Sequence, residues 1–314
     1  MKIVFMGTPQ FSVVILKRLH KEYGVDLVVT QPDKHVGRKK VLTFSPVKEK
    51  ALELEIPVFQ PINIKKDYKT ITNLKPDIII TAAYGQIIPQ IVLDSPPLGC
   101  INVHGSLLPL LRGGAPIQRS IKRLHNTTGI TIMYMAMKMD SGDIISQRSI
   151  PILRDDTSGT LFEKLSFVGR DLLMNTLPKI IDGSNDRIPQ DVAMVSYAYN
   201  LKREEEQIDW NKSKEQIDAH VRAFTPTPTC FTTIDDKQLK VLRVSIEQDD
   251  DFEHIKHLEN GTIVRVEKNT IGVKVNNGVI RIKEVQLAGK KKQDVKTFMN
   301  GAGRNLIKIE KLFK

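Results

Sequence analysis

Long apolar runs are absent from this sequence. Stretches such as 78–80 and 133–137 fall far short of the ~20 apolar residues that a membrane-spanning helix needs. Residues 1–7 hold one charge and only a short apolar run, so we expect no signal peptide. Cysteine is also scarce. Because Cys100 and Cys230 lie far apart, with no CxxC or Cys/His cluster, the sequence argues against a disulfide scaffold and against a structural zinc site. We therefore expect a cytoplasmic protein that needs no metal.

Acidic residues are outnumbered by basic ones, and the excess is unevenly placed. The chain has 47 Lys and Arg against 36 Asp and Glu, for a net charge of +11. Residues 261–314 carry 13 basic and 4 acidic side chains, whereas residues 201–260 carry 9 and 14. Lys34, Arg38, Lys39 and Lys40 form a second basic group. Such a charge distribution predicts a polyanionic partner, and charge alone leaves the type of polyanion open.

The first 200 residues alternate between short apolar strands and helical patterns, which predicts a Rossmann-like parallel sheet with helices on both faces. The continuous apolar run at 77–82 is typical of a central parallel strand that is buried on both sides. We expect strands at 2–6, 27–30, 58–59, 77–82, 101–104, 129–135 and 144–151, the last two joined as a hairpin, and helices at 11–19, 47–54, 68–74 and 161–177. The polar stretch 31–45 is expected to be a long loop.

Beyond Pro228 the pattern changes to short alternating strands, which predicts a small, OB-like β-barrel. The expected strands are 240–244, 261–266, 271–275 and 279–283, with a tight hairpin turn at 276–278. A helix at 213–223 is expected to precede them, with Ser213 as its N-cap. A length of 314 residues fits two domains. We expect a catalytic domain at 1–200, a linker at 201–212 and a second domain at 213–314.

Asn102 and His104 are the main candidates for chemistry. Residues i and i+2 of a strand point to the same face, and this strand should end where open α/β sheets bind ligands. An amide beside an imidazole can hold an oxyanion and move a proton. Either carboxylate of the turn between two later strands, Asp140 or Asp143, could orient and charge-stabilise the histidine. The alternatives are a polar strand end and a turn carboxylate that caps its own backbone.

Residues 6–11 test another possibility, because Gly7 follows a strand and precedes a helix. The second and third glycines of the GxGxxG fingerprint are missing, which disfavours dinucleotide binding and a nicotinamide-dependent oxidoreductase. A tight turn between strand and helix explains Gly7 better.

Taken together, the motif Asn-x-His-Gly-Ser-Leu-Leu-Pro, the segment 112–118 and Met-Asp-Ser-Gly-Asp at 139–143 resemble the 10-formyltetrahydrofolate-dependent formyltransferases. The resemblance implies that Asn102, His104 and Asp140 are the catalytic residues. It also implies a folate site and no metal. The folate-binding residues that it implies are Ser106, Leu107, Leu108, Pro109, Tyr84, Gly85, Gln86 and Ile87.

The resemblance extends to the members of that family whose acceptor is initiator methionyl-tRNA. It rests on Met-Gly-Thr-Pro-x-Phe at 6–11, the basic segment 31–48, and the segments 206–210 and 222–224. One departure is Thr227, which stands between two prolines where the pattern has a Trp. The implied reaction is formyl transfer to the α-amino group of methionine on the tRNA. The implied tRNA contacts are Arg38, Lys39, Lys40 and Lys202.

Two other functions stay open at this stage. A formyltransferase acting on an amino sugar nucleotide would share the Asn/His core, but should lack the basic loop and the basic C-terminal barrel. A nucleic-acid-binding protein with a catalytically dead α/β domain would not need all three candidate residues. Nothing in the sequence demands more than a monomer.

Overall fold

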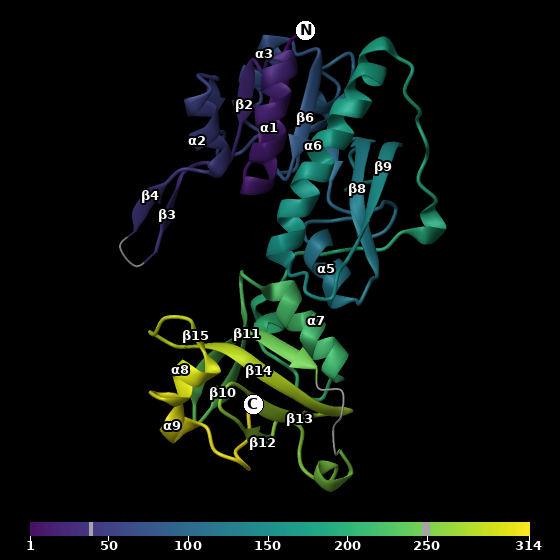
Figure 1. Cartoon of the computed structure of the whole chain (residues 1–314). Coiled ribbons are helices and arrows are strands. Elements are labelled where there is room, and N and C mark those ends of the chain that lie inside the picture. The colour runs from purple at the N-terminus through teal and green to yellow at the C-terminus, as the bar shows by residue number, and fades with distance from the viewer. Residues whose placement is uncertain (38–39, 247–251) are drawn as a thin grey trace. The chain divides into compact units, whose positions relative to one another are not determined.

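The computed structural model describes residues 1–37, 40–246 and 252–314 (Figure 1). The chain divides into two compact units. The N-terminal unit comprises Met1–Pro116, Thr127–Pro151 and Phe162–Asn200, and the C-terminal unit comprises Ile117–Asn126, Ile152–Leu161 and Leu201–Lys314. The segments 117–126 and 152–161 therefore group with the second half of the chain rather than with the sheet that precedes them.

A seven-stranded sheet forms the centre of the N-terminal unit, in the order β5-β2-β1-β6-β7-β8-β9. Its strands are β1 (Ile3–Gly7), β2 (Leu27–Val29), β5 (Val58–Phe59), β6 (Ile78–Ala82), β7 (Cys100–His104), β8 (Thr127–Tyr134) and β9 (Ile144–Pro151). The first five strands in this order, β5, β2, β1, β6 and β7, pair in parallel, and β8 and β9 add an antiparallel edge. The predicted Rossmann-like sheet is confirmed, with a hairpin at one edge.

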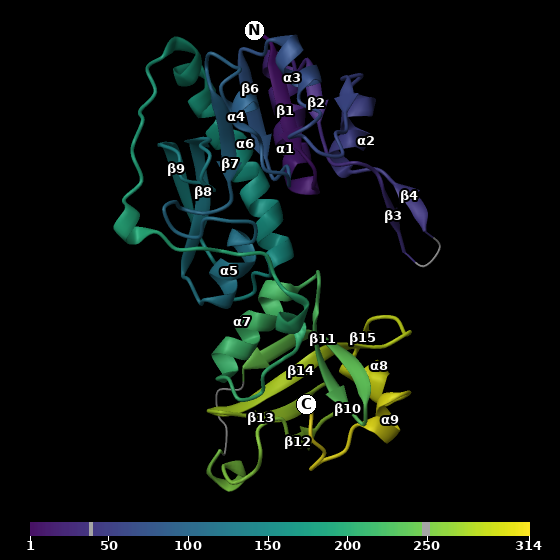
Figure 2. The same ribbon diagram turned by 180° about the vertical axis from the view of Figure 1, so that it is seen from behind.

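Helices cover both faces of this sheet, because its central strands are apolar throughout: every residue of β1 and β6 is buried. Helices α1 (Gln10–Tyr23) and α6 (Ser158–Asp182) lie over one face (Figures 1 and 2). On the other face, Val4 and Met6 pack with residues of α3 (Lys69–Leu74) and α4 (Gln90–Leu93). Helix α2 (Pro46–Glu53) packs near β2 and α1.

Gly7 sits where β1 comes closest to α1. A Cβ built on Gly7 would lie 2.7 Å from Ser12 Cβ and 3.0 Å from the Ala82 carbonyl oxygen. The Ser12 hydroxyl donates to that same carbonyl at 2.5 Å. The glycine therefore permits close strand–helix packing, as the tight-turn interpretation expected.

The predicted loop at 31–45 is wrong for part of its length. Residues Lys34–Val36 (β3) and Val41–Thr43 (β4) pair in an antiparallel hairpin, hereafter the basic arm, which projects from the sheet body (Figure 1). All six of these residues are exposed, so the arm has no apolar alternation for a sequence pattern to reveal. Cross-strand backbone hydrogen bonds hold it. Arg38 and Lys39 lie outside the described residues.

The C-terminal unit contains an antiparallel sheet in the order β10-β11-β14-β13-β12, with β15 beside β14. Its strands are β10 (Cys230–Ile234), β11 (Lys237–Ile246), β12 (Ile263–Val266), β13 (Ile271–Val275), β14 (Gly278–Leu287) and β15 (Gln293–Asp294). The predicted turn at 276–278 is confirmed, since Val275 pairs with Gly278. The described residues of this unit include the helices α7 (Lys214–Phe224), α8 (Val295–Met299) and α9 (Gly303–Leu306). They also include α5 (Pro116–Lys122) without its first residue, and the first turn of α6.

The last five residues join the two edge strands of that sheet. Ile263 N–H donates to Lys311 O at 2.8 Å on the β12 side, and Thr233 N–H donates to Lys314 O at 2.8 Å on the β10 side. Phe313 is buried between these contacts, stacked on Trp210. The edges are thus connected through the chain end, as a small barrel requires.

Ser213 caps α7 as predicted, accepting from Gln216 N–H.

Across the described ranges, no helix combines the length and the apolar character needed to cross a membrane.

Candidate functional site

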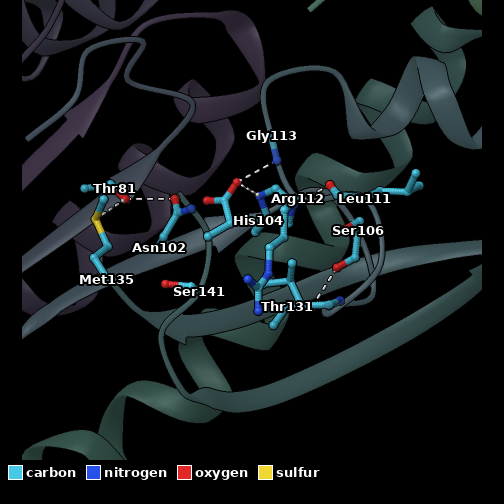
Figure 3. Close-up of polar contacts among 12 residues, drawn as sticks. Thr81, Asn102, His104, Ser106, Leu111, Arg112, Gly113, Thr131, Met135 and Ser141 are labelled. Atoms are coloured by element: carbon cyan, nitrogen blue, oxygen red, sulfur yellow. Dashed lines mark hydrogen bonds and ion pairs between the residues drawn. The ribbon is translucent and has the colours of Figure 1, made fainter. Parts of the chain in front are cut away.

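Asn102 lies on β7, beside the end of β6. The Thr81 hydroxyl is 2.8 Å from Asn102 Oδ1 and donates to it (Figure 3). Thr81 Oγ1 also lies 3.2 Å from the Ile101 carbonyl and 3.3 Å from Met135 Sδ, but the amide oxygen is its nearest acceptor. With its oxygen on Thr81, the half-buried amide keeps its two N–H groups for a ligand. An oxyanion needs donors held in this way.

His104, two residues along the same strand, is buried to 5% exposure. Its Nε2 lies 3.2 Å from the Leu111 carbonyl oxygen, and because a carbonyl only accepts, Nε2 carries a proton. Its Nδ1 lies 3.7 Å from Asp140 Oδ2. That separation is too long for a hydrogen bond but close enough for an ion pair when the ring is charged. The Leu111 carbonyl therefore holds Nε2, and Nδ1 faces the Asp140 carboxylate.

Asp140 reaches the histidine from the loop between β8 and β9. Its Oδ2 accepts the Gly113 backbone N–H at 2.8 Å. Asp140 has φ 49°, in the left-handed region that Asp adopts more readily than most residues other than glycine. Gly113 has φ +125°, and a Cβ there would lie 2.7 Å from the Ala198 carbonyl oxygen. Glycine at 113 therefore lets the backbone bring its N–H to the carboxylate.

The segment Ser106–Pro109 forms a loop that is held by hydrogen bonds to side chains of β8 and β9. The Thr131 hydroxyl donates to Ser106 O at 2.7 Å, and Leu108 N–H donates to the same hydroxyl at 3.1 Å. Gln147 Nε2 donates to Leu108 O at 2.8 Å. The Leu108 side chain is buried, whereas Leu107 and Pro109 are half-buried. The loop thus follows directly after β7, the strand that carries Asn102 and His104.

The second group of predicted folate residues follows β6. The Tyr84 side chain is only 4% exposed and packs in the apolar layer under α3 and α4, where burial raises the pKa of its phenol. The Gln86 amide is tied to the segment before α3, accepting from Ile64 N–H at 2.9 Å and donating to Pro61 O at 3.1 Å. Ile87 is 69% exposed. Gly85 has φ +95° beside the Gln31 amide.

Two of the predicted tRNA contacts fall within the described residues. Lys40 is exposed in the turn of the basic arm. Lys202 is exposed at the start of the 3₁₀ turn Arg203–Glu206, and its backbone N–H donates to Glu205 Oε2 at 3.0 Å. In the described part of the chain, no group of three or more His, Cys, Asp or Glu side chains is placed to hold a metal ion.

The family model described as "Formyl transferase" matches residues 1–177, and "Formyl transferase, C-terminal domain" matches residues 200–303. The chain belongs to the formyl transferase family. The methionyl-tRNA formyltransferase of Lysinibacillus sphaericus is 48% identical over 309 residues, 97% of each protein. That of Staphylococcus epidermidis is 46% identical over 309 residues, 98% of each.

Solved structures of other proteins share the fold. The N-formyltransferase of Helicobacter canadensis, in complex with folinic acid and dTDP-3-aminofucose, superposes with a TM-score of 0.68 at 18% identity. That match covers 90% of this chain and 98% of the other. HypX of Aquifex aeolicus in complex with tetrahydrofolic acid gives 0.65 at 14% identity, over 99% of this chain and 50% of HypX. At these identities the likeness shows the fold alone.

Residues outside the sequence motifs also contribute to this candidate site. Thr81 orients Asn102, the Ser196 hydroxyl accepts Leu111 N–H at 3.0 Å, and Gln190 contacts Arg112 and the Asp140 loop. No spacing pattern singled them out. Thr81 could have been found from the parallel alignment of β6 with β7, which places it opposite Asn102.

Proposed function

We propose that this chain transfers the formyl group of 10-formyltetrahydrofolate to the α-amino group of methionine on initiator tRNA. The observation that carries the proposal is the meeting of Asn102, His104 and Asp140 at the end of β7, in a chain that matches methionyl-tRNA formyltransferases over nearly its whole length. We further propose that it acts in the cytoplasm as a monomer.

The acceptor amine attacks only when it is unprotonated. A free α-amino group has a pKa of ~7.7–8.0, and the neighbouring ester of a charged tRNA lowers it, so the neutral amine is available near pH 7. Attack on the formyl carbon places negative charge on the formyl oxygen. The Asn102 amide donates to that oxygen, because its N–H groups are turned away from Thr81.

His104 moves the proton that the amine loses, passing it towards the folate nitrogen that leaves. Asp140 faces its Nδ1 and stabilises the charged ring while it holds the proton. The folate lies against the loops that follow β6 and β7, with Ser106–Pro109 and Tyr84–Ile87 as its proposed contacts. The loop backbone is already ordered by Thr131 and Gln147, so little entropy is lost when folate binds.

The tRNA is bound through its phosphates. The proposed contacts are Arg38, Lys39, Lys40 and Lys202, and the basic segment 261–314 supplies affinity without reading sequence. Because Lys and Arg contacts to phosphate release counterions, tRNA affinity should fall steeply with salt.

A formylation assay tests the proposal. The purified chain receives 10-formyltetrahydrofolate and, in separate reactions, initiator Met-tRNA, elongator Met-tRNA or a dTDP-amino sugar. We expect formylmethionyl-tRNA from the initiator, with the folate analogue folinic acid raising the melting temperature. Formylation of the amino sugar nucleotide without any on tRNA would overturn the proposal in favour of a sugar formyltransferase.

A further inference from the structure

Gln190 has a side-chain amide in which every hydrogen-bonding position is used. Its Oε1 accepts from Arg112 Nε at 3.0 Å and from Arg112 Nη2 at 2.8 Å. Its Nε2 donates to the Asp140 carbonyl at 2.9 Å and to the Gly142 carbonyl at 2.7 Å. Two lone pairs and two N–H groups thus have four partners.

The chemistry of these partners settles which way the amide faces. A guanidinium only donates, and a backbone carbonyl only accepts, so Oε1 must face Arg112 and Nε2 must face the loop. No other side chain of this size makes both kinds of contact. A glutamate could accept hydrogen bonds from the arginine but could not donate to the loop carbonyls, and an apolar residue could do neither.

The two elements that Gln190 joins are the two that meet at the Asp140 carboxylate. Arg112 precedes Gly113, whose N–H donates to Asp140 Oδ2. The carbonyls of Asp140 and Gly142 belong to the loop that carries that carboxylate. Gln190 therefore spans both sides of the contact, from a segment about fifty residues further along the chain.

The backbone of the Asp140 loop is closely packed. Asp140 has φ 49°, in the left-handed region, which Asp adopts more readily than most residues other than glycine. Two residues later the backbone passes so close to β8 that a Cβ on Gly142 would lie 2.0 Å from the Tyr134 carbonyl oxygen. Arg112, which is only 7% exposed, has no carboxylate partner among the described residues, so the Gln190 oxygen is the acceptor that keeps its guanidinium in place.

We propose that Gln190 is a positioning residue for formyl transfer: it holds the Asp140 loop against the Arg112–Gly113 backbone, and so keeps the Asp140 carboxylate 3.7 Å from His104 Nδ1. The inference rests on the proposed function of Asn102, His104 and Asp140. Gln190 itself does not contact the reacting atoms.

The decisive variant is Gln190→Glu. It keeps an acceptor for Arg112 but loses both donors, and it sets a negative oxygen against two carbonyl oxygens. We expect kcat to fall at least tenfold while KM for 10-formyltetrahydrofolate and for tRNA each stay within about twofold, because a displaced Asp140 affects the chemical step rather than binding. Gln238→Glu, an exposed position on β11, makes the same charge change and should leave kcat unaltered.

A double-mutant cycle separates positioning from general loosening. If Gln190 acts through Asp140, Gln190→Glu added to Asp140→Ala should lower the residual rate by less than twofold, although it lowers the parent rate at least tenfold. An equal loss in both backgrounds would overturn the inference, as would a parent kcat that stays within twofold. If Gln190→Glu does not fold, Gln190→Met removes the same donors without adding charge and carries the same cycle. Absence of tRNA formylation by the unaltered chain would instead contradict the proposed function.

Discussion

At the scale of single residues, the candidate site is a set of polar groups whose partners decide which atom faces the substrate. The Thr81 hydroxyl donates to the Asn102 amide oxygen, and the Gly113 N–H donates to Asp140 Oδ2. His104 Nε2 donates to the Leu111 carbonyl. In each case the partner comes from a neighbouring strand or loop. The side chains are thus pre-oriented before substrate binds, which is what electrostatic stabilisation of a developing charge requires.

Alanine substitutions of the three candidates should each remove most of kcat and leave the fold intact. We expect Asn102→Ala to lower kcat by ~10²–10³, since one oxyanion donor is lost. His104→Ala should lower it by ~10²–10⁴, through loss of the acid–base group. Asp140→Ala should lower kcat by a factor in the same range as His104→Ala. Steady-state formylation of Met-tRNA measures the effect, and near-normal turnover of His104→Ala would contradict the proton-transfer role.

Thr81→Val should impair catalysis through Asn102 alone. Valine has almost the shape of threonine but cannot donate, so the Asn102 amide loses the contact that sets its orientation. We expect kcat to fall severalfold with little change in KM for either substrate, because binding contacts are untouched. Thr81→Ser keeps the hydroxyl and serves as the control. Equal rates for the valine and serine variants would show that the hydroxyl does not orient the amide.

At the scale of elements, the basic arm is held at its base by one network. Lys48 Nζ donates to Asp33 Oδ2 at 2.5 Å and lies 3.9 Å from the centre of the Phe44 ring, while Gln60 Nε2 donates to Asp33 Oδ1 at 2.8 Å. These hydrogen bonds, led by that of Lys48, lower the pKa of Asp33. The network ties both ends of the arm to the sheet body, so the exposed strands leave from a defined point.

Asp33→Ala should therefore weaken tRNA binding without affecting folate. Loss of the carboxylate frees Lys48 and Gln60, and the arm then samples orientations in which its lysines miss the phosphates. We expect KM for Met-tRNA to rise several-fold while KM for 10-formyltetrahydrofolate stays constant. Asp94→Ala, which removes an exposed carboxylate at the C-terminal end of α4, is the control. Parallel increases in both KM values would argue that Asp33 supports the site as a whole.

At the scale of the whole molecule, the C-terminal unit has a built-in sensitivity to acid. His220 on α7 stacks on Phe224, with 4.6 Å between ring centres, and its Nε2 is buried without a partner in the described part of the chain. Burial, reinforced by the nearby Lys122 ammonium, lowers the pKa of His220 to about 4. The folded unit therefore keeps this ring neutral.

The free energy of unfolding of this unit should fall as the pH drops from about 6.5 towards about 4. Between these pH values His220 binds a proton in the unfolded chain but not in the folded unit. The free energy of unfolding therefore falls by up to about 1.4 kcal/mol per pH unit. Trp210 is the only tryptophan and is buried in this unit, so its fluorescence during urea unfolding at pH 4.5 to 6.5 follows the effect.

His220→Phe keeps an aromatic ring over Phe224 and removes the titrating nitrogens, so its unfolding free energy should depend less steeply on pH. His257→Phe, at an exposed position of the same unit, should keep the parent's pH dependence. The same slope in His220→Phe and in the parent would mean that His220 is not the group responsible.

Much of this architecture could be predicted from the sequence, because it depends on interactions between near neighbours. The apolar run of β6, the turn before Gly278 and the Ser213 cap of α7 are each decided within a few residues. The pairing of Asn102 with His104 on one face follows from the two-residue period of a strand. The carboxylates of the turn at 139–143 were candidates from the sequence, and the family resemblance selected Asp140.

The tertiary structure alone decided the contacts that make this set a site. Gln190 and Thr81 stand in segments with no distinctive pattern, and they matter because folding brings them 2.7 to 3.0 Å from loops or strands remote in sequence. The basic arm escaped prediction because its exposed strands are held by backbone hydrogen bonds rather than by a buried face. Sequence periodicity records which face of an element is buried, whereas the partner of a single polar group depends on the path of the whole chain.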